Sequence, residues 1–177
     1  MSYYSTDITL SEKDYYVFNK FCLLKSKKGK KQLLTYRILL TIIILIFPLF
    51  FTIKDGPSNI IFAYLLLLIL FQALTIPFYT LILKLHLKSL KKSGKPLYSA
   101  TSHLDFCEDV FIETTPNNKT EQKYSGIERV SIYNNYIYIH MNPVLGYILP
   151  RSSFENDGKF AEFIEFIKTK CNSVDIY

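Results

Sequence analysis

The chain has 177 residues with a formal net charge of +6, and 49% of its residues are hydrophobic. A basic excess can neutralise nucleic-acid phosphates, but residues 97–177 hold 7 basic and 11 acidic residues, which argues against nucleic acid as a partner. Three dispersed cysteines without a CxxC pair give neither a disulfide framework nor a zinc motif.

Residues 1–32 precede the first apolar segment and are expected to form a short strand and an amphipathic helix. Residues 8–10 (ITL) are typical of a strand, and residues 11–14 (SEKD) of a helix start, because serine caps the helix and acids favour its first turn. Apolar residues then recur at Tyr15, Phe18 and Cys22, so this helix should lie against the soluble domain or the membrane surface. Whether the strand joins a C-terminal sheet is left open.

Two apolar segments within residues 33–85 are expected to form a transmembrane hairpin, with helices at about 33–53 and 60–83. The runs 38–53 and 60–83 contain no charged residue. About 20 helical residues cross a hydrocarbon layer of about 30 Å, so both segments are long enough. A soluble helical hairpin would need a polar face, which residues 60–83 lack. The intervening KDGPSN sequence is expected to form the turn.

Basic residues crowd the outer ends of both segments, whereas the turn holds one lysine beside Asp55. The positive-inside rule then places both termini in the cytoplasm. We expect a multi-pass protein of a cytoplasmic membrane. These flanks could also bind anionic lipid headgroups, or serve only as a topology signal. They comprise Lys25, Lys27, Lys28, Lys30, Lys31 and Arg37 before the hairpin, and Lys84, Lys88, Lys91, Lys92 and Lys95 after it.

Arg37 and Gln72 are polar residues inside the apolar segments. Arg37 is expected to extend its guanidinium to the headgroups while its stem stays apolar. Gln72 needs a hydrogen-bond partner in lipid, which could be Thr41, Thr75, a carbonyl freed near Pro77, or Gln72 of a second copy in a homodimer. We interpret Gln72 as a residue that fixes helix packing, because helices without an ionisable residue at their centres make a poor pore or pump.

Residues 97–177 are expected to form a cytoplasmic β-rich domain after a linker at residues 91–96. Short runs of strand-forming residues alternate with turn signals, including PNNK at residues 116–119 and Asn134-Asn135, which suits a hairpin turn with positive φ. Residues 157–171 are expected to form an amphipathic helix capped by Asn156 or Asp157. The strands are expected at residues 97–104, 106–115, 121–124, 129–133, 136–140 and 146–149.

This pattern predicts a membrane α-hairpin joined to an α+β domain. In that domain an antiparallel split barrel of five to seven strands is closed by the C-terminal helix, which is the outline of a pleckstrin-homology-like domain. A ferredoxin-like or cystatin-like sheet is the competing solution. It would need a second helix, which only the N-terminal region could supply.

The sequence GYILPRSSF at residues 146–154, followed by the helix at 160–167, resembles the YcxB-like family of bacterial membrane proteins. Residues 124–127 (YSGI) also resemble a family motif, although Tyr124 stands where the family usually has tryptophan and Gly126 where it has an acid. The resemblance implies an N-terminal strand and helix, two transmembrane helices, and a C-terminal domain of pleckstrin-homology-like character. It implies no activity.

Catalytic and metal-binding patterns are not found in the sequence. No GxSxG elbow supports a nucleophile, and the glycines form no phosphate-binding loop. We therefore expect no catalytic residue, no cofactor and no metal site. The residues considered for such roles are His86, His103, His140, Asp105, Glu108 and Asp109.

Tyrosines on the predicted strands are the best candidates for an interface, because tyrosine supplies a large contact area at low rotamer cost. They are Tyr133, Tyr136, Tyr138 and Tyr147; ordinary strand packing is the alternative reading. We expect a non-enzymatic, membrane-anchored binding or scaffold protein that presents its domain to a protein partner or to anionic headgroups. An immunity membrane protein that neutralises a membrane-active or secreted toxin is the second hypothesis.

Overall fold

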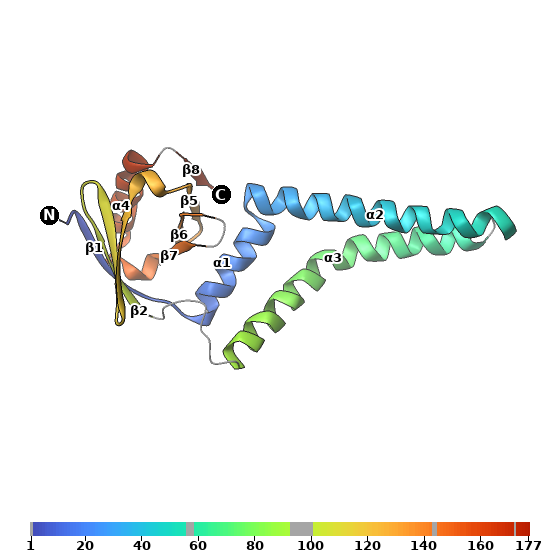
Figure 1. Ribbon diagram of the computed structural model, residues 1–177, viewed down its shortest axis with the longest axis horizontal. Coiled ribbons are helices and arrows are strands. Elements are labelled where there is room, and N and C mark those ends of the chain that lie inside the picture. Colours follow the sequence, from blue (N-terminus) through green and yellow to red (C-terminus); the bar gives the residue numbers. More distant parts are fainter. Residues whose placement is uncertain (1, 56–58, 93–100, 143–144, 172) are drawn as a thin grey trace. The chain divides into compact units, whose positions relative to one another are not determined.

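The computed structural model describes residues 2–55, 59–92, 101–142, 145–171 and 173–177, without the side chains of residues 47–55, 59–61, 63 and 91. Within this part the fold is α+β, with four α-helices and eight strands (Figure 1). The expected linker residues 93–96, including Lys95, lie outside the described part. The helices are α1 (Glu12–Leu24), α2 (Lys27–Asp55), α3 (Asn59–Lys92) and α4 (Asp157–Lys170). The strands are β1 (Tyr4–Thr9), β2 (Thr101–Phe106), β3 (Val110–Thr115), β4 (Asn118–Lys123), β5 (Arg129–Tyr133), β6 (Tyr136–His140), β7 (Gly146–Pro150) and β8 (Val174–Ile176).

The chain divides into two compact units. The first, which we call the α+β unit, comprises Met1–Phe18 and Gly94–Tyr177. The second, the hairpin unit, comprises Asn19–Ser93. The N-terminal strand therefore belongs to the same unit as the C-terminal strands, although the long hairpin separates them in sequence.

Two four-stranded sheets form the α+β unit, with the orders β1-β2-β3-β4 and β7-β6-β5-β8. They do not close into a barrel. β1 pairs antiparallel with β2, from Tyr4 opposite Phe106 to Thr9 opposite Thr101, so the N-terminal strand does join the sheet. β8 pairs parallel with β5. The expectation of five to seven antiparallel strands is thus corrected by β8, a three-residue strand too short for a periodicity signal.

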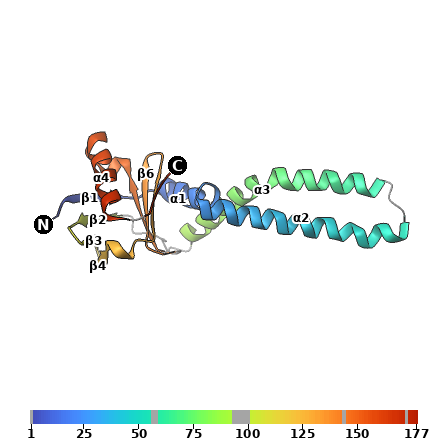
Figure 2. The ribbon, with the colours of Figure 1, turned by 90° about the horizontal axis from the view of Figure 1, so that it is seen from above.

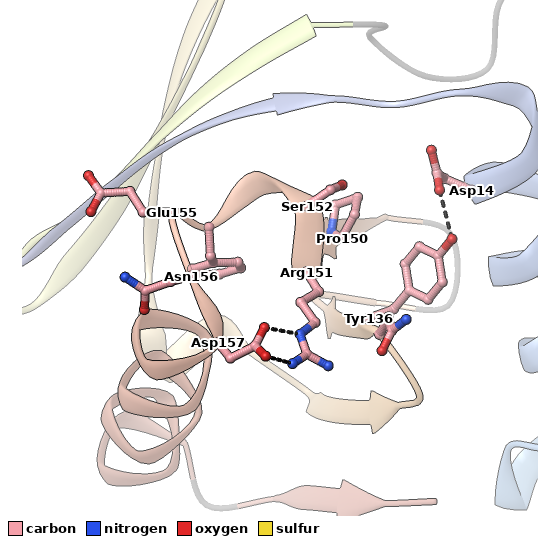
Figure 3. A pocket seen from close by; sticks show the side chains of 10 residues that line it. Asp14, Tyr136, Pro150, Arg151, Ser152, Glu155, Asn156 and Asp157 are labelled. Atoms are coloured by element: carbon pink, nitrogen blue, oxygen red, sulfur yellow. Dashed lines mark hydrogen bonds and ion pairs between the residues drawn. The ribbon is translucent and has the colours of Figure 1, made fainter.

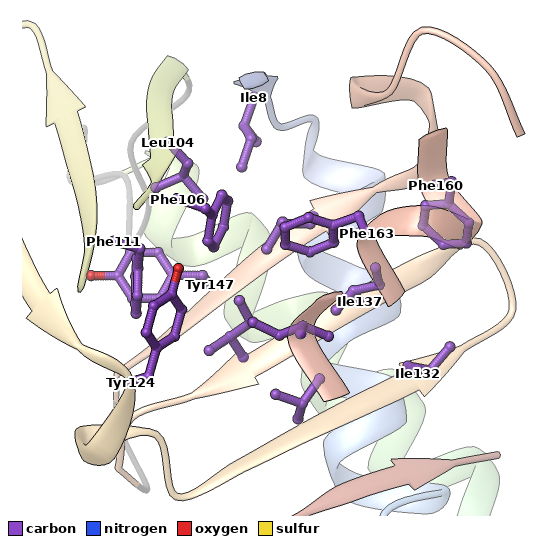
Figure 4. Packing of buried hydrophobic residues seen from close by; sticks show 14 residues of the cluster. Ile8, Leu104, Phe106, Phe111, Tyr124, Ile132, Ile137, Tyr147, Phe160 and Phe163 are labelled. Carbon is purple, nitrogen blue, oxygen red and sulfur yellow. The ribbon is translucent and has the colours of Figure 1, made fainter. Parts of the chain in front are cut away.

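The core of this unit gathers aromatic and aliphatic side chains from both sheets and from α4 (Figure 4). Phe163 of α4 is fully buried, and its ring centroid lies 4.7 Å from that of Phe106, 5.3 Å from Phe154 and 5.5 Å from Tyr4. Burial alternates along β1, because successive side chains of a strand point to opposite faces, whereas successive residues of β5, β6 and β7 are buried. The helix stripe of Phe160, Phe163 and Ile167 therefore meets the inner faces of the strands.

The outer face of β6 is also covered. Tyr138 and His140 are buried, and the ring of Phe18 from α1 lies 5.0 Å from Tyr138 and 5.9 Å from His140. Both faces of β6 are therefore buried at these residues, because the start of α1 packs on the face that carries Tyr138 and His140. A helix that precedes the hairpin in sequence thus shields a strand that follows it.

Helix α4 starts at a capped position. Asn156 has extended backbone angles, and its side-chain Oδ1 accepts a hydrogen bond of 2.9 Å from the Lys159 backbone N–H. Such a bond satisfies one of the free N–H groups of the first turn. Of the two expected caps, the structure uses Asn156.

Replacing Asn156 by alanine is expected to lower the free energy of unfolding by about 1 kcal/mol, since the first turn of α4 loses its acceptor. Urea unfolding of the full chain in detergent micelles, followed by circular dichroism, measures this change. Asn156→Asp keeps an acceptor and should stay within about 0.5 kcal/mol of the parent protein. Equal losses in both variants would contradict a capping role.

Helices α2 and α3 of the hairpin unit lie side by side (Figure 2). Among the described side chains, α3 is the one helix long and apolar enough to cross a membrane, over Tyr64–Leu90. Its side chains are exposed, with Ile69 at 66% and Phe78 at 60%. The expected first crossing, residues 33–53, includes residues 47–53, whose side chains are not among those described.

Candidate functional site

A pocket of about 450 Å³ opens in the α+β unit beside the segment that joins β7 to α4 (Figure 3). This pocket coincides with the sequence motif at residues 146–154 that carries the family resemblance. Its lining residues come from α1, the β5–β6 turn, the end of β7 and the start of α4. They are Asp14, Asn135, Tyr136, Pro150, Arg151, Ser152, Phe154, Glu155, Asn156 and Asp157.

Local backbone structure positions these side chains. Asn134 adopts φ 52°, which the tight turn between β5 and β6 requires and which asparagine tolerates. Tyr136 then pairs with Pro150 across β6 and β7, and the Arg151 N–H donates to the Asn135 carbonyl at 2.8 Å. A 3-10 turn at Arg151–Ser153 redirects the chain toward α4. The pocket floor is therefore fixed by backbone hydrogen bonds.

Arg151 forms the basic element of the pocket. Its Nε donates to Asp157 Oδ1 at 2.7 Å, and its Nη2 pairs with Asp157 Oδ2, so the contact is bidentate. The guanidinium carbon also lies 5.8 Å from the centroid of the Phe160 ring. An ion pair this exposed contributes only about 0 to 1 kcal/mol of stability. Its effect is to neutralise Arg151 and to hold it beside the start of α4.

Asp14 and Tyr136 form a second polar pair on the opposite side. The Tyr136 hydroxyl donates to Asp14 Oδ1 at 2.7 Å, and Ser11 donates to Oδ2 from its backbone N–H and hydroxyl. Burial opposes ionisation of Asp14, but the hydrogen bonds from Ser11 and Tyr136 outweigh it and lower the pKa of the carboxyl below its ordinary value. Burial first, and then the bond to Asp14, raises the pKa of Tyr136 to about 12.

Replacing Tyr136 by phenylalanine is expected to destabilise the α+β unit by about 1 kcal/mol, because Asp14 loses a hydrogen bond to its charged form. The pKa of Asp14 should rise. Chemical-shift titration of the Asp14 carboxyl carbon measures this shift, with Tyr133→Phe as the control. An unchanged Asp14 titration would show that the hydroxyl bond is absent in solution.

The charge of the pocket favours a cationic ligand. Three carboxylates line it, those of Asp14, Glu155 and Asp157, against the single guanidinium of Arg151, which is already paired. Glu155 is exposed at the rim. Such a surface attracts a lysine or arginine side chain and repels a phosphate.

A second polar cluster lies on sheet β1-β2-β3-β4. Ser5 Oγ lies 2.9 Å from His103 Nε2, and His103 Nδ1 lies 2.6 Å from Asp7 Oδ1, a spacing that resembles a hydrolytic triad. However, Asp105 also lies 3.4 Å from Nε2, and the Asp7 side chain is 87% exposed. The hydrogen bond to Asp7 first, and the charge of Asp105 with it, raise the pKa of His103. The two carboxylates thus favour the protonated form of His103.

Metal ligation finds no support among the described residues, since they contain no group of three His, Cys, Asp or Glu side chains that could hold an ion. Cys22, Cys107 and Cys171 are free thiols. Burial raises the pKa of the Cys171 thiol to about 11, which keeps it protonated and unreactive at neutral pH.

The four tyrosines of the sequence prediction do not form one exposed row. Tyr138 is fully buried, and Tyr147 is 7% exposed with its ring 5.1 Å from Phe111 in the core. Their burial removes them from any surface contact. Tyr133 and Tyr136 are half-buried, and Tyr136 lies in the pocket. An interface role remains a prediction for these two.

The basic residues of the flanks lie at the start of α2 and at the end of α3. Their described side chains are exposed, apart from Arg37, while Lys91 and Lys95 are not among the described side chains. The exposed lysines are Lys25, Lys27, Lys28, Lys30, Lys31, Lys84, Lys88 and Lys92.

Arg37 forms a side-chain hydrogen bond within the hairpin unit. Its Nε donates to Gln72 Oε1 at 2.7 Å, and Gln72 Nε2 donates to Thr41 Oγ1 at 2.7 Å. Thr41, one of the expected partners of Gln72, in turn donates to the Arg37 carbonyl. The guanidinium therefore lies against α3 in the hairpin unit.

Residues 108–167 match the family model described as YcxB-like protein. The match runs from the segment before β3 into α4 and includes the pocket segment 150–157. It confirms the family resemblance read from the sequence. No curated protein and no solved structure matches the chain.

Proposed function

We propose that this protein is a non-enzymatic, membrane-anchored binding protein, whose α+β unit is presented at the cytoplasmic face of the bacterial inner membrane. The observation that carries the proposal is the exposed apolar helix Tyr64–Leu90 in the same chain as a folded α+β unit. Exposed apolar surface on this scale is unfavourable in water and favourable in lipid. The helix thus acts as an anchor.

The proposed anchor is a hairpin with two crossings, α2 and α3. The hydrogen bonds from Gln72 to Thr41 and from Arg37 to Gln72 support it, because they join the two helices side by side. The exposed lysines at the start of α2 and the end of α3 support cytoplasmic termini. In this arrangement the α+β unit and its pocket face the cytoplasm.

The pleckstrin-homology-like assignment remains part of the proposal. Two four-stranded sheets followed by the helix α4, which fills the core between them, support it. We propose the pocket at residues 150–157 as the binding site. Its three carboxylates favour a basic segment of a protein partner over an anionic lipid headgroup.

Site-specific photocrosslinking in cells tests the binding site. A photoreactive residue in place of Ser152, which is exposed at the pocket, should capture a defined protein partner. Glu155→Lys reverses a rim charge and should reduce that crosslink about fivefold, as a rim charge with a close partner is worth about 1 kcal/mol. Glu128→Lys, an exposed acid outside the pocket, is the matched control.

The identity of the captured protein decides between the roles. A scaffold or signalling partner with a basic segment supports the proposal, and a toxin would select the immunity role. Equal crosslinks in the Glu155→Lys and Glu128→Lys proteins would contradict the pocket as the site. Release of the full chain from membranes by alkaline carbonate would contradict the anchor itself.

A further inference from the structure

A charged side chain lies within the apolar span of the hairpin unit. Arg37 Nε is 2.7 Å from Gln72 Oε1. At a rise of 1.5 Å per residue, Gln72 lies about 12 Å along the helix axis from Tyr64, where the span starts, and about 18 Å from Lys84, the first lysine of the basic flank that ends it. The Gln72 side chain is too short to reach either end of the span. If α3 crosses the membrane, the Arg37 guanidinium lies in the hydrocarbon region.

No carboxylate of the hairpin can neutralise this guanidinium. Asp55 is the only acidic residue between Tyr15 and Leu104. It stands at the far end of α2, about 27 Å along the helix from Arg37. A second copy of the chain would add another Arg37 and no acid within the span. Intramembrane charges are costly, and they mark functional positions when they persist.

The guanidinium of Arg37 is held by a hydrogen bond from Nε. Gln72 accepts from Nε and donates to Thr41, and Thr41 donates to the Arg37 carbonyl, so the amide is used on both sides. In the described part of the chain, no hydrogen bond joins Nη1 or Nη2 to another residue. These donors form part of the planar fork that a carboxylate binds in a bidentate manner.

Apolar side chains beside Arg37 complete a surface on which a helix can pack. Leu34, three residues before Arg37, and Leu45, eight residues after it, lie near the same face of α2 and are 58% and 48% exposed, and Ile38, the next residue in sequence, is 51% exposed. A lipid phosphate would neutralise the charge only if the guanidinium left Gln72 for the headgroups. The bond to Gln72 thus favours a ligand at the same depth.

We propose that Arg37, positioned by Gln72 and Thr41, binds an Asp or Glu side chain in a transmembrane helix of a partner protein. This proposal rests on the membrane anchor of the proposed function. It assigns the hairpin a binding role separate from that of the pocket. The partner is recognised by its intramembrane carboxylate.

The experiment uses the full chain with a donor fluorophore, reconstituted in phosphatidylcholine vesicles. The probe is a leucine-rich transmembrane peptide with an acceptor fluorophore and one central glutamate, and the control peptide carries glutamine at that position. Energy transfer should show about tenfold tighter association of the glutamate peptide, as expected for a strong polar contact in lipid. Arg37→Gln should abolish this preference, and Arg37→Lys, which keeps the charge, should retain most of it.

Several outcomes would overturn the docking site. The first is equal association of the two peptides with the parent protein. The second is an unchanged preference for the glutamate peptide in Arg37→Gln. The third is loss of that preference in phosphatidylglycerol vesicles, where lipid phosphates neutralise Arg37. Arg37-dependent transfer between two labelled copies without peptide would overturn it in favour of self-association. Extraction of the same vesicles with alkaline carbonate separates the two proposals. A protein that stays in the vesicles but shows no preference for the glutamate peptide contradicts only the docking site. A protein that carbonate releases contradicts the anchor.

Discussion

Replacing Phe163 by alanine is expected to lower the free energy of unfolding of the α+β unit by about 4 kcal/mol. The side chain is fully buried, and aromatic rings from β1, β2 and the segment before α4 surround it. Its removal leaves a cavity between the two sheets and also removes edge-to-face ring contacts with Phe106 and Tyr4.

Urea unfolding of the full chain in detergent micelles, followed by near-ultraviolet circular dichroism of the tyrosines, measures the loss. Leu145→Ala, at a residue 44% exposed, is the control and should change stability by less than about 0.5 kcal/mol. Phe163→Leu should fall between the two. A loss below about 1 kcal/mol for Phe163→Ala would mean that the helix and sheets do not share this core.

Acidification from pH 7 to pH 4 is expected to remove up to about 3 kcal/mol of stability through His140 alone. Burial, and then the charge of Arg129, lower the pKa of His140 to about 4 from its ordinary 6.5. The unfolded chain therefore binds a proton near pH 6.5 that the folded chain excludes. Stability is fully present above pH 6.5, falls as the pH decreases from 6.5 to about 4, and is constant with respect to this group below that.

His140→Gln removes the titrating group, and its urea midpoint should vary much less between pH 7 and pH 4. His103 provides a control of opposite sign. Its pKa is raised in the folded protein, so its contribution is present at low pH and disappears as the pH rises through the folded pKa. His103→Gln should therefore steepen the loss of stability on acidification. A parent protein equally stable at pH 7 and pH 4 would contradict the burial of a neutral His140.

Local signals in the sequence located several elements. Asn156 was one of two expected caps, with Asp157 as the alternative, and residues 157–171 were expected to be helical where α4 spans Asp157–Lys170. Asn134-Asn135 marked the β5–β6 turn through its tolerance of positive φ. These features depend on neighbours within four residues, which a sequence displays directly.

Contacts between residues far apart in the sequence could not be predicted from such local signals. The pairing of β1 with β2 joins residues about 100 positions apart, and nothing local in residues 4–9 specifies that partner. The same pairing brings Ser5, Asp7 and His103 together. Likewise, nothing local in residues 136–140 indicates that Phe18 of α1 covers Tyr138 and His140.

The sequence motif at residues 146–154 was read as a family resemblance and not as a site, and the pocket overlaps it only at residues 150–154. The pocket also needs Asp14, whose contact with Tyr136 spans the hairpin in sequence. Arg37 was expected to reach the headgroups, since a helix considered by itself offers its guanidinium no hydrogen-bond acceptor in the apolar segment. Gln72 on the neighbouring helix provides an alternative acceptor, which a reading of each helix by itself does not reveal.

Cysteine accessibility in intact bacterial cells tests the central claim, a hairpin that crosses the membrane twice. The three native cysteines are replaced by alanine, and single cysteines are introduced at Ser2, Ser58 and Ser173 in separate proteins. A membrane-impermeant maleimide should label the Ser58→Cys protein from outside, and the Ser2→Cys and Ser173→Cys proteins only after permeabilisation. Labelling of either terminal cysteine in intact cells, or protection of the one at position 58, would contradict the account.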